Sequence, residues 1–148
     1  MAAVTLRAQA IRLLARREYA RAELEERLIA KGGAREEVCA LLDDLVARGY
    51  LSNERYARSV VRRKASNFSR RRISAELKMS GVGSAEIAAA LAEAGDDDDA
   101  TLAALWERRF GDLPANDREK ARQVRYLQAR GFSLAAIFKL LRARSADR

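Results

Sequence analysis

The sequence contains no histidine and only one cysteine among its 148 residues. The lack of histidine excludes most zinc sites and every His-based catalytic triad. The single Cys39 cannot form an internal disulfide, so nothing points to an oxidising compartment. Because Cys39 lies beside Val38, Leu41 and Leu42, we expect a packed core thiol and not a nucleophile.

Long apolar runs are also missing. The longest uncharged stretch, residues 131–138, is far too short to cross a bilayer. Residues 1–7 lack the apolar core of a secretory signal, so we expect a cytoplasmic protein with no membrane contact. Neither glycine-rich phosphate-binding pattern is present, and the carboxylates are spread along helical faces. We therefore expect no catalytic residue, no metal and no cofactor.

Proline and glycine are scarce, at one and eight residues, whereas 49% of the chain is apolar and 34% is charged. This composition favours many helices joined by short turns, and hence an all-α fold. The formal net charge is +8, which draws a protein to polyanions. The excess lies in residues 51–95, which carry nine Lys and Arg against four Asp and Glu.

One pattern, L-x3-G-x5-[VI]-x3-L, occurs three times, with glycines at positions 32, 81 and 131. Copies at a nearly constant period of 49 and then 50 residues indicate a structural repeat. In each copy the glycine ends one helix, because it adopts the left-handed conformation without a Cβ penalty. The Val or Ile and the Leu that follow share a face of the next helix. In the first copy that face extends over Val38, Leu41, Leu42, Leu45 and Val46.

A further helix precedes each pair, so each repeat is predicted to have three helices and the chain about nine. We place the repeats at residues 1–51, 52–95 and 96–148. Ser84 and Ser133 stand where helices should start, and serine is a good N-cap. The Asp96–Asp99 run is typical of a solvated loop or a helix N-terminus.

The helix–glycine–helix pairs also resemble a helix-turn-helix, which raises the alternative of a DNA-binding transcription regulator. Its second helix would need donors for bases and phosphates. The second helices of the first two repeats are rich in acidic residues or nearly free of basic ones. Only the third, with Lys139, Arg142 and Arg144, suits an anionic groove, so three tandem operator readers are disfavoured.

Residues 58–72 form a basic segment without any acidic residue. We expect its side chains to contact DNA phosphates or an acidic protein surface. An exposed Phe68 would stack on a base, whereas the alternative is a core Phe68 with solvated arginines around it. The arginines near the predicted helix start at residue 70 are expected to be open to solvent. The candidate residues of this segment are Arg58, Arg62, Arg63, Lys64, Phe68, Arg70, Arg71 and Arg72.

Four stretches, in order along nearly the whole chain, resemble the RecX family. They are residues 13–24, residues 42–57 with their Leu-Asp-Asp-Leu and Gly-Tyr-Leu-Ser-Asn-Glu-Arg-Tyr-Ala runs, residues 72–78 and residues 127–133. At residues 66–69 the chain has Ser-Asn-Phe-Ser, where family members more often have a glycine. This departure concerns local loop contacts and not the likeness as a whole.

The resemblance implies a non-enzymatic, elongated and curved protein, monomeric by our expectation, that takes part in recombination, repair and the SOS response. Such a protein binds the RecA recombinase, lies in the groove of the RecA–DNA filament, and restrains filament growth, ATP hydrolysis and strand exchange. Affinity for single- and double-stranded DNA with little sequence preference is also implied.

A third hypothesis, besides the RecA modulator and the transcription regulator, is a structural adaptor that binds protein and no nucleic acid.

Overall fold

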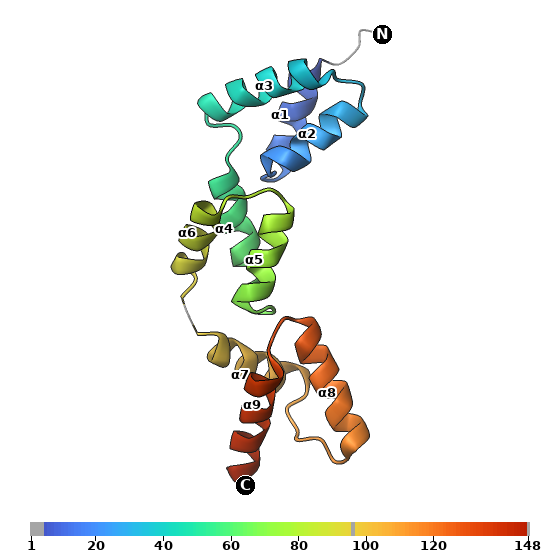
Figure 1. Cartoon of the computed structure of the whole chain (residues 1–148), viewed down its shortest axis with the longest axis vertical. Coiled ribbons are helices and arrows are strands. Elements are labelled where there is room, and N and C mark those ends of the chain that lie inside the picture. The colour runs from blue at the N-terminus through green and yellow to red at the C-terminus, as the bar shows by residue number, and fades with distance from the viewer. Residues whose placement is uncertain (1–4, 96, 148) are drawn as a thin grey trace. The chain divides into compact units, whose positions relative to one another are not determined.

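In a computed structural model that describes residues 5–95 and 97–147, the described chain folds into nine α-helices and no strand (Figure 1). This confirms the predicted all-α class. No described helix is both long and apolar enough to cross a membrane. The helices are α1 (Leu6–Arg16), α2 (Arg21–Ala30), α3 (Arg35–Ala47), α4 (Asn53–Lys64), α5 (Arg70–Met79), α6 (Ser84–Glu93), α7 (Asp98–Arg109), α8 (Asp117–Ala129) and α9 (Leu134–Ala146).

The described chain divides into two compact units, and α4, α5 and α6 contribute residues to both. The N-terminal unit comprises Met1–Val60 with Glu76–Ala90, and the C-terminal unit comprises Val61–Ala75 with Leu91–Arg148. The repeat limits given above, and the arrangement of the repeats as an elongated, curved array, stay predictions.

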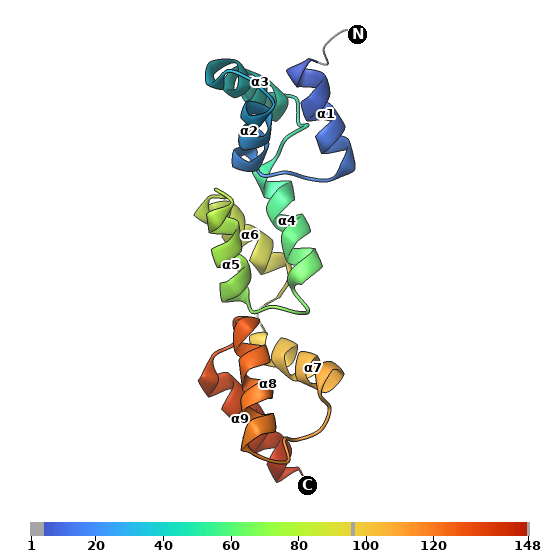
Figure 2. The same ribbon diagram turned by 90° about the vertical axis from the view of Figure 1, so that its right-hand side faces the viewer.

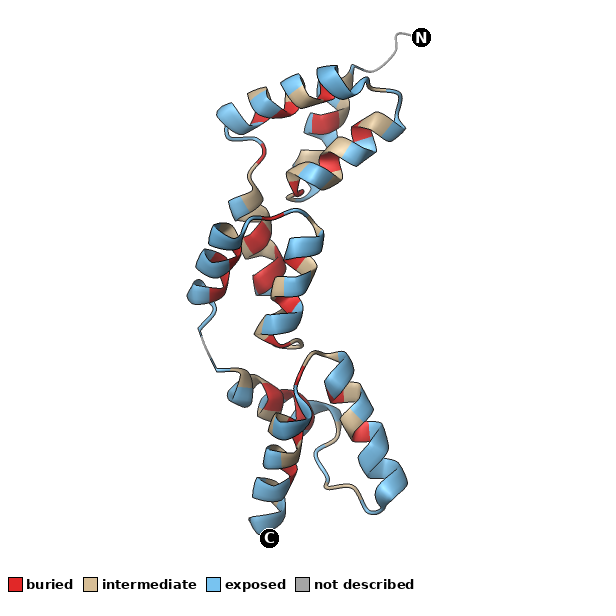
Figure 3. Ribbon diagram, viewed as in Figure 1, coloured by how far each residue is buried: buried red, intermediate tan, exposed pale blue. Residues whose placement is uncertain are grey.

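In the N-terminal unit, α1, α2 and α3 pack around one apolar core, and each of the three helices contributes buried residues to it (Figures 2 and 3). On α3, Val38, Leu42 and Leu45 are fully buried, as the i, i+4, i+7 spacing predicts, and Leu41 is half buried. Val46, the last residue of the predicted face, is 46% exposed, so the prediction is wrong at that position.

Cys39 is only half buried, with its Sγ atom 3.7 Å from Glu25 Oε1. The prediction of a core thiol is wrong. Cys39 directly follows the buried Val38, so the turn of the helix places it at the edge of the buried face.

In the C-terminal unit, α7, α8 and α9 enclose a second core (Figure 1). Its buried residues are Leu102, Leu105, Trp106, Leu127, Phe132, Ile137 and Leu141. The indole of Trp106 finds a polar partner inside this core, since its Nε1 donates to Gln123 Oε1 at 2.9 Å. Gln123 in turn donates to the backbone oxygen of Asp112 at 3.1 Å, so both buried polar groups are paired.

The three repeat glycines end their helices as predicted, with positive φ at Gly32 (+100°), Gly81 (+83°) and Gly131 (+95°). Two of them also allow a close approach between helices. A Cβ on Gly81 would lie 3.1 Å from Ala22 Cβ at the start of α2, and one on Gly131 would lie 2.5 Å from Arg72 Cβ at the start of α5. In each of these places the start of one helix packs against the end of another.

Helix N-termini are capped largely where the sequence indicates. Ser133 is the N-cap of α9, and its side chain accepts from the amide of Ala136 at 3.1 Å. Asp97 caps α7, with Asp98 and Asp99 in the first turn, as expected of an acidic helix start. Asp96 and residues 1–4, on which parts of our sequence predictions rest, lie outside the described residues. Ser84 is the first residue of α6 and not its N-cap, because the amide of Ile87 already bonds to the Gly83 oxygen.

Candidate nucleic-acid interface

The basic segment begins on the last turns of α4. Arg58 is half buried and paired with Glu54 one turn earlier. Arg62 and Arg63 are exposed, and in the described part of the chain neither forms an ion pair or a hydrogen bond. Their guanidinium donors are therefore available to an anionic ligand.

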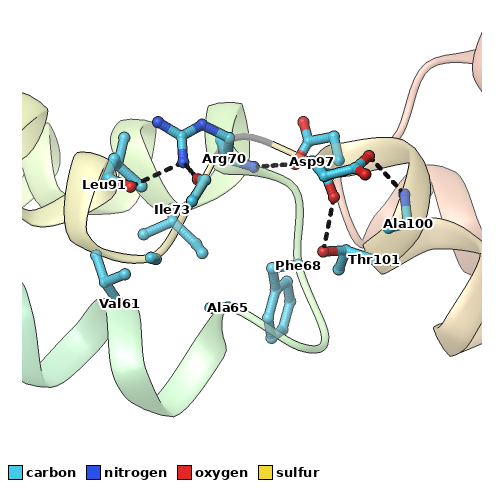
Figure 4. Close-up of a pocket in the computed structure, with 12 residues that line it drawn as sticks. Val61, Ala65, Phe68, Arg70, Ile73, Leu91, Asp97, Ala100 and Thr101 are labelled. Carbon is cyan, nitrogen blue, oxygen red and sulfur yellow. Dashed lines mark hydrogen bonds between the residues drawn. The ribbon is translucent and has the colours of Figure 1, made fainter.

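At the other end of the segment, Arg70 is a structural residue. Its side chain is half buried, and Nη1 donates to the backbone oxygens of Leu91, at 2.9 Å, and Gly95 (Figure 4). Its amide donates to Asp98 Oδ1 at 3.1 Å. The expectation that Arg70 is open to solvent is wrong, because its guanidinium caps the carbonyls at the end of α6.

Arg71 and Arg72 are exposed, as expected, and their guanidinium groups reach the end of α8. Arg72 Nη1 donates to the oxygen of Ala129 at 2.8 Å, and Arg71 Nη2 to that of Gly131 at 3.4 Å. The amide of Ser69 donates a hydrogen bond to the backbone oxygen of Arg130 at 2.9 Å. The oxygens of Ala129 and Arg130 belong to the end of α8, where a helix leaves its last carbonyls without amide partners. Both arginines keep further donors at the surface, since each guanidinium carries five.

Phe68 is neither a core residue nor a freely exposed one. Its half-buried ring lines a cavity of ≈ 240 Å³ together with Val61, Ile73 and Leu91 (Figure 4). Cationic groups gather near the same ring at distances typical of cation–π contacts. They are Lys64 Nζ at 5.4 Å, Arg72 Cζ at 5.6 Å and Arg130 Cζ at 4.7 Å from its centroid.

The three basic residues predicted on the last helix of the third repeat lie on α9. Lys139 is exposed, with its Nζ 4.0 Å from Asp99. Arg144 pairs with Glu107 at 3.8 Å and lies 5.6 Å from the Trp106 ring, so its charge is partly neutralised. Arg142 is exposed beside Pro114 and Phe138.

The basic residues of α7 and α8 were not among the predicted contacts. Arg118, Arg122 and Arg125 are exposed on α8, and their i, i+4, i+7 spacing, readable in the sequence, places them on one face. Arg108 Nη2 donates to the oxygen of Ser66 at 3.0 Å and to Asn67 Oδ1 at 3.1 Å. The loop that carries Phe68 is thus held from α7, and the basic surface of the C-terminal unit extends beyond the residues of the basic segment that belong to it, 61–72.

Comparison with known proteins gives consistent matches over nearly the whole chain. The sequence models of the second and third RecX three-helix domains match residues 52–91 and 96–141. Regulatory protein RecX of Ralstonia nicotianae is 41% identical, over 97% of this chain and 90% of that protein. Regulatory protein RecX of Pseudomonas savastanoi pv. phaseolicola is 44% identical, over 97% of this chain and 94% of that protein.

A solved structure supports the same fold. The crystal structure of RecX from Lactobacillus salivarius superposes with a TM-score of 0.66 and 19% sequence identity, over 93% of each chain. At that identity the structural match supports only the fold, whereas the similar sequences show which family the chain belongs to. The resemblance that the sequence indicated is therefore confirmed, and this chain belongs to the RecX family of regulatory proteins.

Proposed function

We propose that this chain acts as a monomer on the RecA–DNA filament in the cytoplasm, and that its basic segment meets DNA phosphates or acidic RecA side chains there. Membership of the RecX family makes it a regulatory protein that modulates the RecA recombinase, and not an enzyme. The contact with DNA is made by arginines of the basic segment. Restraint of filament growth and strand exchange then follows from binding alone.

One observation carries the proposal. Arg62, Arg63, Arg71 and Arg72 are exposed within fifteen residues that contain no acid. Clustered guanidinium groups bind phosphate oxygens through charge-assisted hydrogen bonds. Such contacts do not read bases, so they agree with binding that has little sequence preference.

A pull-down on RecA filaments, with and without DNA, tests the proposal. We expect the chain to be retained by the filament and released as salt rises, because both candidate partners are anionic. The informative variant is Arg62→Gln with Arg63→Gln. A matched control is Arg12→Gln with Arg16→Gln, since these exposed arginines lie four apart on α1.

The double variant at 62 and 63 should bind duplex DNA more weakly. A plot of the logarithm of its DNA affinity against the logarithm of the salt concentration should have a slope shallower than that of the wild type by about two. The α1 control should bind like the wild type. Equal retention and equal salt slopes for both variants would mean that the basic segment is only a solvated face. No retention of the wild type on filaments at micromolar excess would overturn the proposal as a whole.

A further inference from the structure

Three aromatic rings of the C-terminal unit are joined by arginines into one continuous row, which we name the ring–arginine ladder. Its rings come from the loop before α5, from the end of α7 and from α8. Each ring is half buried, so each keeps part of its surface at solvent. The members, in order along the row, are Lys64 and Arg72, Phe68, Arg130, Tyr126, Arg109, Phe110 and Arg122.

Arg130 joins the first two rings. Its Cζ atom lies 4.7 Å from the centroid of Phe68 and 4.9 Å from that of Tyr126. The backbone of Arg130 is itself held, because its oxygen accepts from the amide of Ser69 at 2.9 Å. The guanidinium is therefore placed between two rings by a fixed piece of backbone.

Arg109 joins the second and third rings in the same way. Its Cζ atom lies 5.1 Å from the centroid of Tyr126 and 5.3 Å from that of Phe110. The two rings meet edge to face, with centroids 5.6 Å apart and planes at 87°. Arg122 continues the row at 6.0 Å from Phe110.

Three arginines of the ladder have no acidic partner among the described residues. Within residues 5–95 and 97–147, none of Arg109, Arg122 and Arg130 lies within 4.0 Å of a carboxylate. Other arginines of the chain differ, since Arg7, Arg17 and Arg55 each pair with an acidic side chain at 2.6–2.9 Å. These three arginines are therefore cations that aromatic rings position and that still need an anion.

From this arrangement we infer that the ladder is a binding platform for single-stranded DNA. Guanidinium planes and aromatic rings both stack on bases, and this stacking tolerates any sequence because every base has a π-face. The N–H groups of the same arginines reach phosphate oxygens. A duplex keeps its base faces inside the helix, so the platform favours single strands over duplex at equal length. This inference rests on the proposed function, and it names the form of DNA that the surface selects.

The test exchanges guanidinium for ammonium at unchanged charge. We compare the full-length wild type with Arg109→Lys combined with Arg130→Lys, using fluorescence anisotropy with a dT oligonucleotide and a duplex of equal length. Lysine keeps the charge but does not stack as a planar group. The variant should bind the oligonucleotide at least about fivefold more weakly, the scale of one stacked base, and the duplex almost as before. Tyr126→Leu, which keeps an apolar side chain, should cause a similar loss.

The matched control is Arg118→Lys with Arg125→Lys, which makes the same exchange on α8 at exposed arginines that form no ring contact in the described chain. It should bind both DNAs like the wild type. An iodouracil oligonucleotide should photo-crosslink to Phe68, Tyr126 or Phe110, as located by mass spectrometry.

Equal loss in both lysine pairs, or no loss in either, would overturn the ladder as a stacking platform. So would equal affinity of the wild type for single strands and duplex. Retention on RecA filaments is measured on the same samples. If the wild type binds RecA filaments but shows no preference for single strands, only the ladder is contradicted. If the wild type does not bind the filaments at all, the proposed function is contradicted.

Discussion

Trp106 Nε1 donates a 2.9 Å hydrogen bond to Gln123 Oε1, and both side chains are buried, at 2% and 4% exposure. Gln123 stands four residues before Leu127 of the repeat pattern. The equivalent residues of the other two repeats are Leu24 and Ile73, both fully buried and apolar. The third repeat therefore accepts a polar residue in its core because Trp106 brings an N–H group that needs an acceptor.

Replacing Gln123 with leucine should lower the free energy of unfolding by about 1–3 kcal/mol, because it leaves the indole N–H buried without a partner. Urea unfolding followed by the fluorescence of the single Trp measures the change. Adding Trp106→Phe to Gln123→Leu removes the donor as well and, with Tyr or circular dichroism as the signal, should cost less than the two changes taken separately. An unchanged urea midpoint for Gln123→Leu would contradict the assigned pair.

Gly131 and Gly32 give a matched test of the close approach of α5 to the end of α8. Both have positive φ, so alanine at either position costs about 1 kcal/mol in backbone strain. Only at position 131 would the new Cβ also collide with Ser69 and Arg72, since nothing lies within 4 Å of position 32. Gly131→Ala should therefore melt at a clearly lower temperature than Gly32→Ala. Equal melting temperatures would show that the approach is looser than described.

Leu77 is a fully buried residue of α5, whereas Met79, two residues later, is 89% exposed. Leu77→Ala should lower the free energy of unfolding by about 2–5 kcal/mol, because it removes buried methyl groups and leaves a cavity. Met79→Ala should have almost no effect. Thermal melts monitored by circular dichroism distinguish the two, and similar losses at both positions would contradict the placement of the core face of α5.

Asp44 accepts hydrogen bonds from Arg7 at 2.6 Å and from Arg48 at 3.0 Å, and these bonds hold the pKa of its carboxyl below the ordinary value. A depressed folded pKa gives stability that is present above the unfolded pKa, about 3.9, and is lost as the pH falls through the folded pKa. Asp44→Asn should therefore melt below the wild type at neutral pH, and the difference should shrink once the pH falls below about 4. A difference that stays constant with pH would mean that the ion pairs contribute nothing.

Much of the fold is predictable because its signals are local. A glycine that ends a helix acts through its own φ, and a serine such as Ser133 caps a helix that starts beside it. The spacing of Val38, Leu42 and Leu45 likewise describes one face of one helix. Each of these features can be judged from fewer than a dozen consecutive residues.

The candidate site is harder to predict because its contacts join distant residues. Arg70 looks like Arg71 and Arg72 in the sequence, yet its partners lie 21 and 28 residues further along the chain. Arg72 meets the end of α8 57 residues away. The ladder depends on three elements meeting in space, and no spacing along the chain indicates that Arg130 lies beside Phe68.

The rate of ATP hydrolysis by RecA on single-stranded DNA tests the central claim most directly, when the chain is titrated to micromolar excess. We expect the wild type and the α1 control, Arg12→Gln with Arg16→Gln, to lower this rate at the same concentrations. Arg62→Gln with Arg63→Gln should need a higher concentration for the same effect, and its difference from the wild type should narrow as salt rises, because the variant makes fewer salt-sensitive contacts with anionic groups. A rate that the wild type leaves unchanged at micromolar excess would contradict regulation of RecA by this chain.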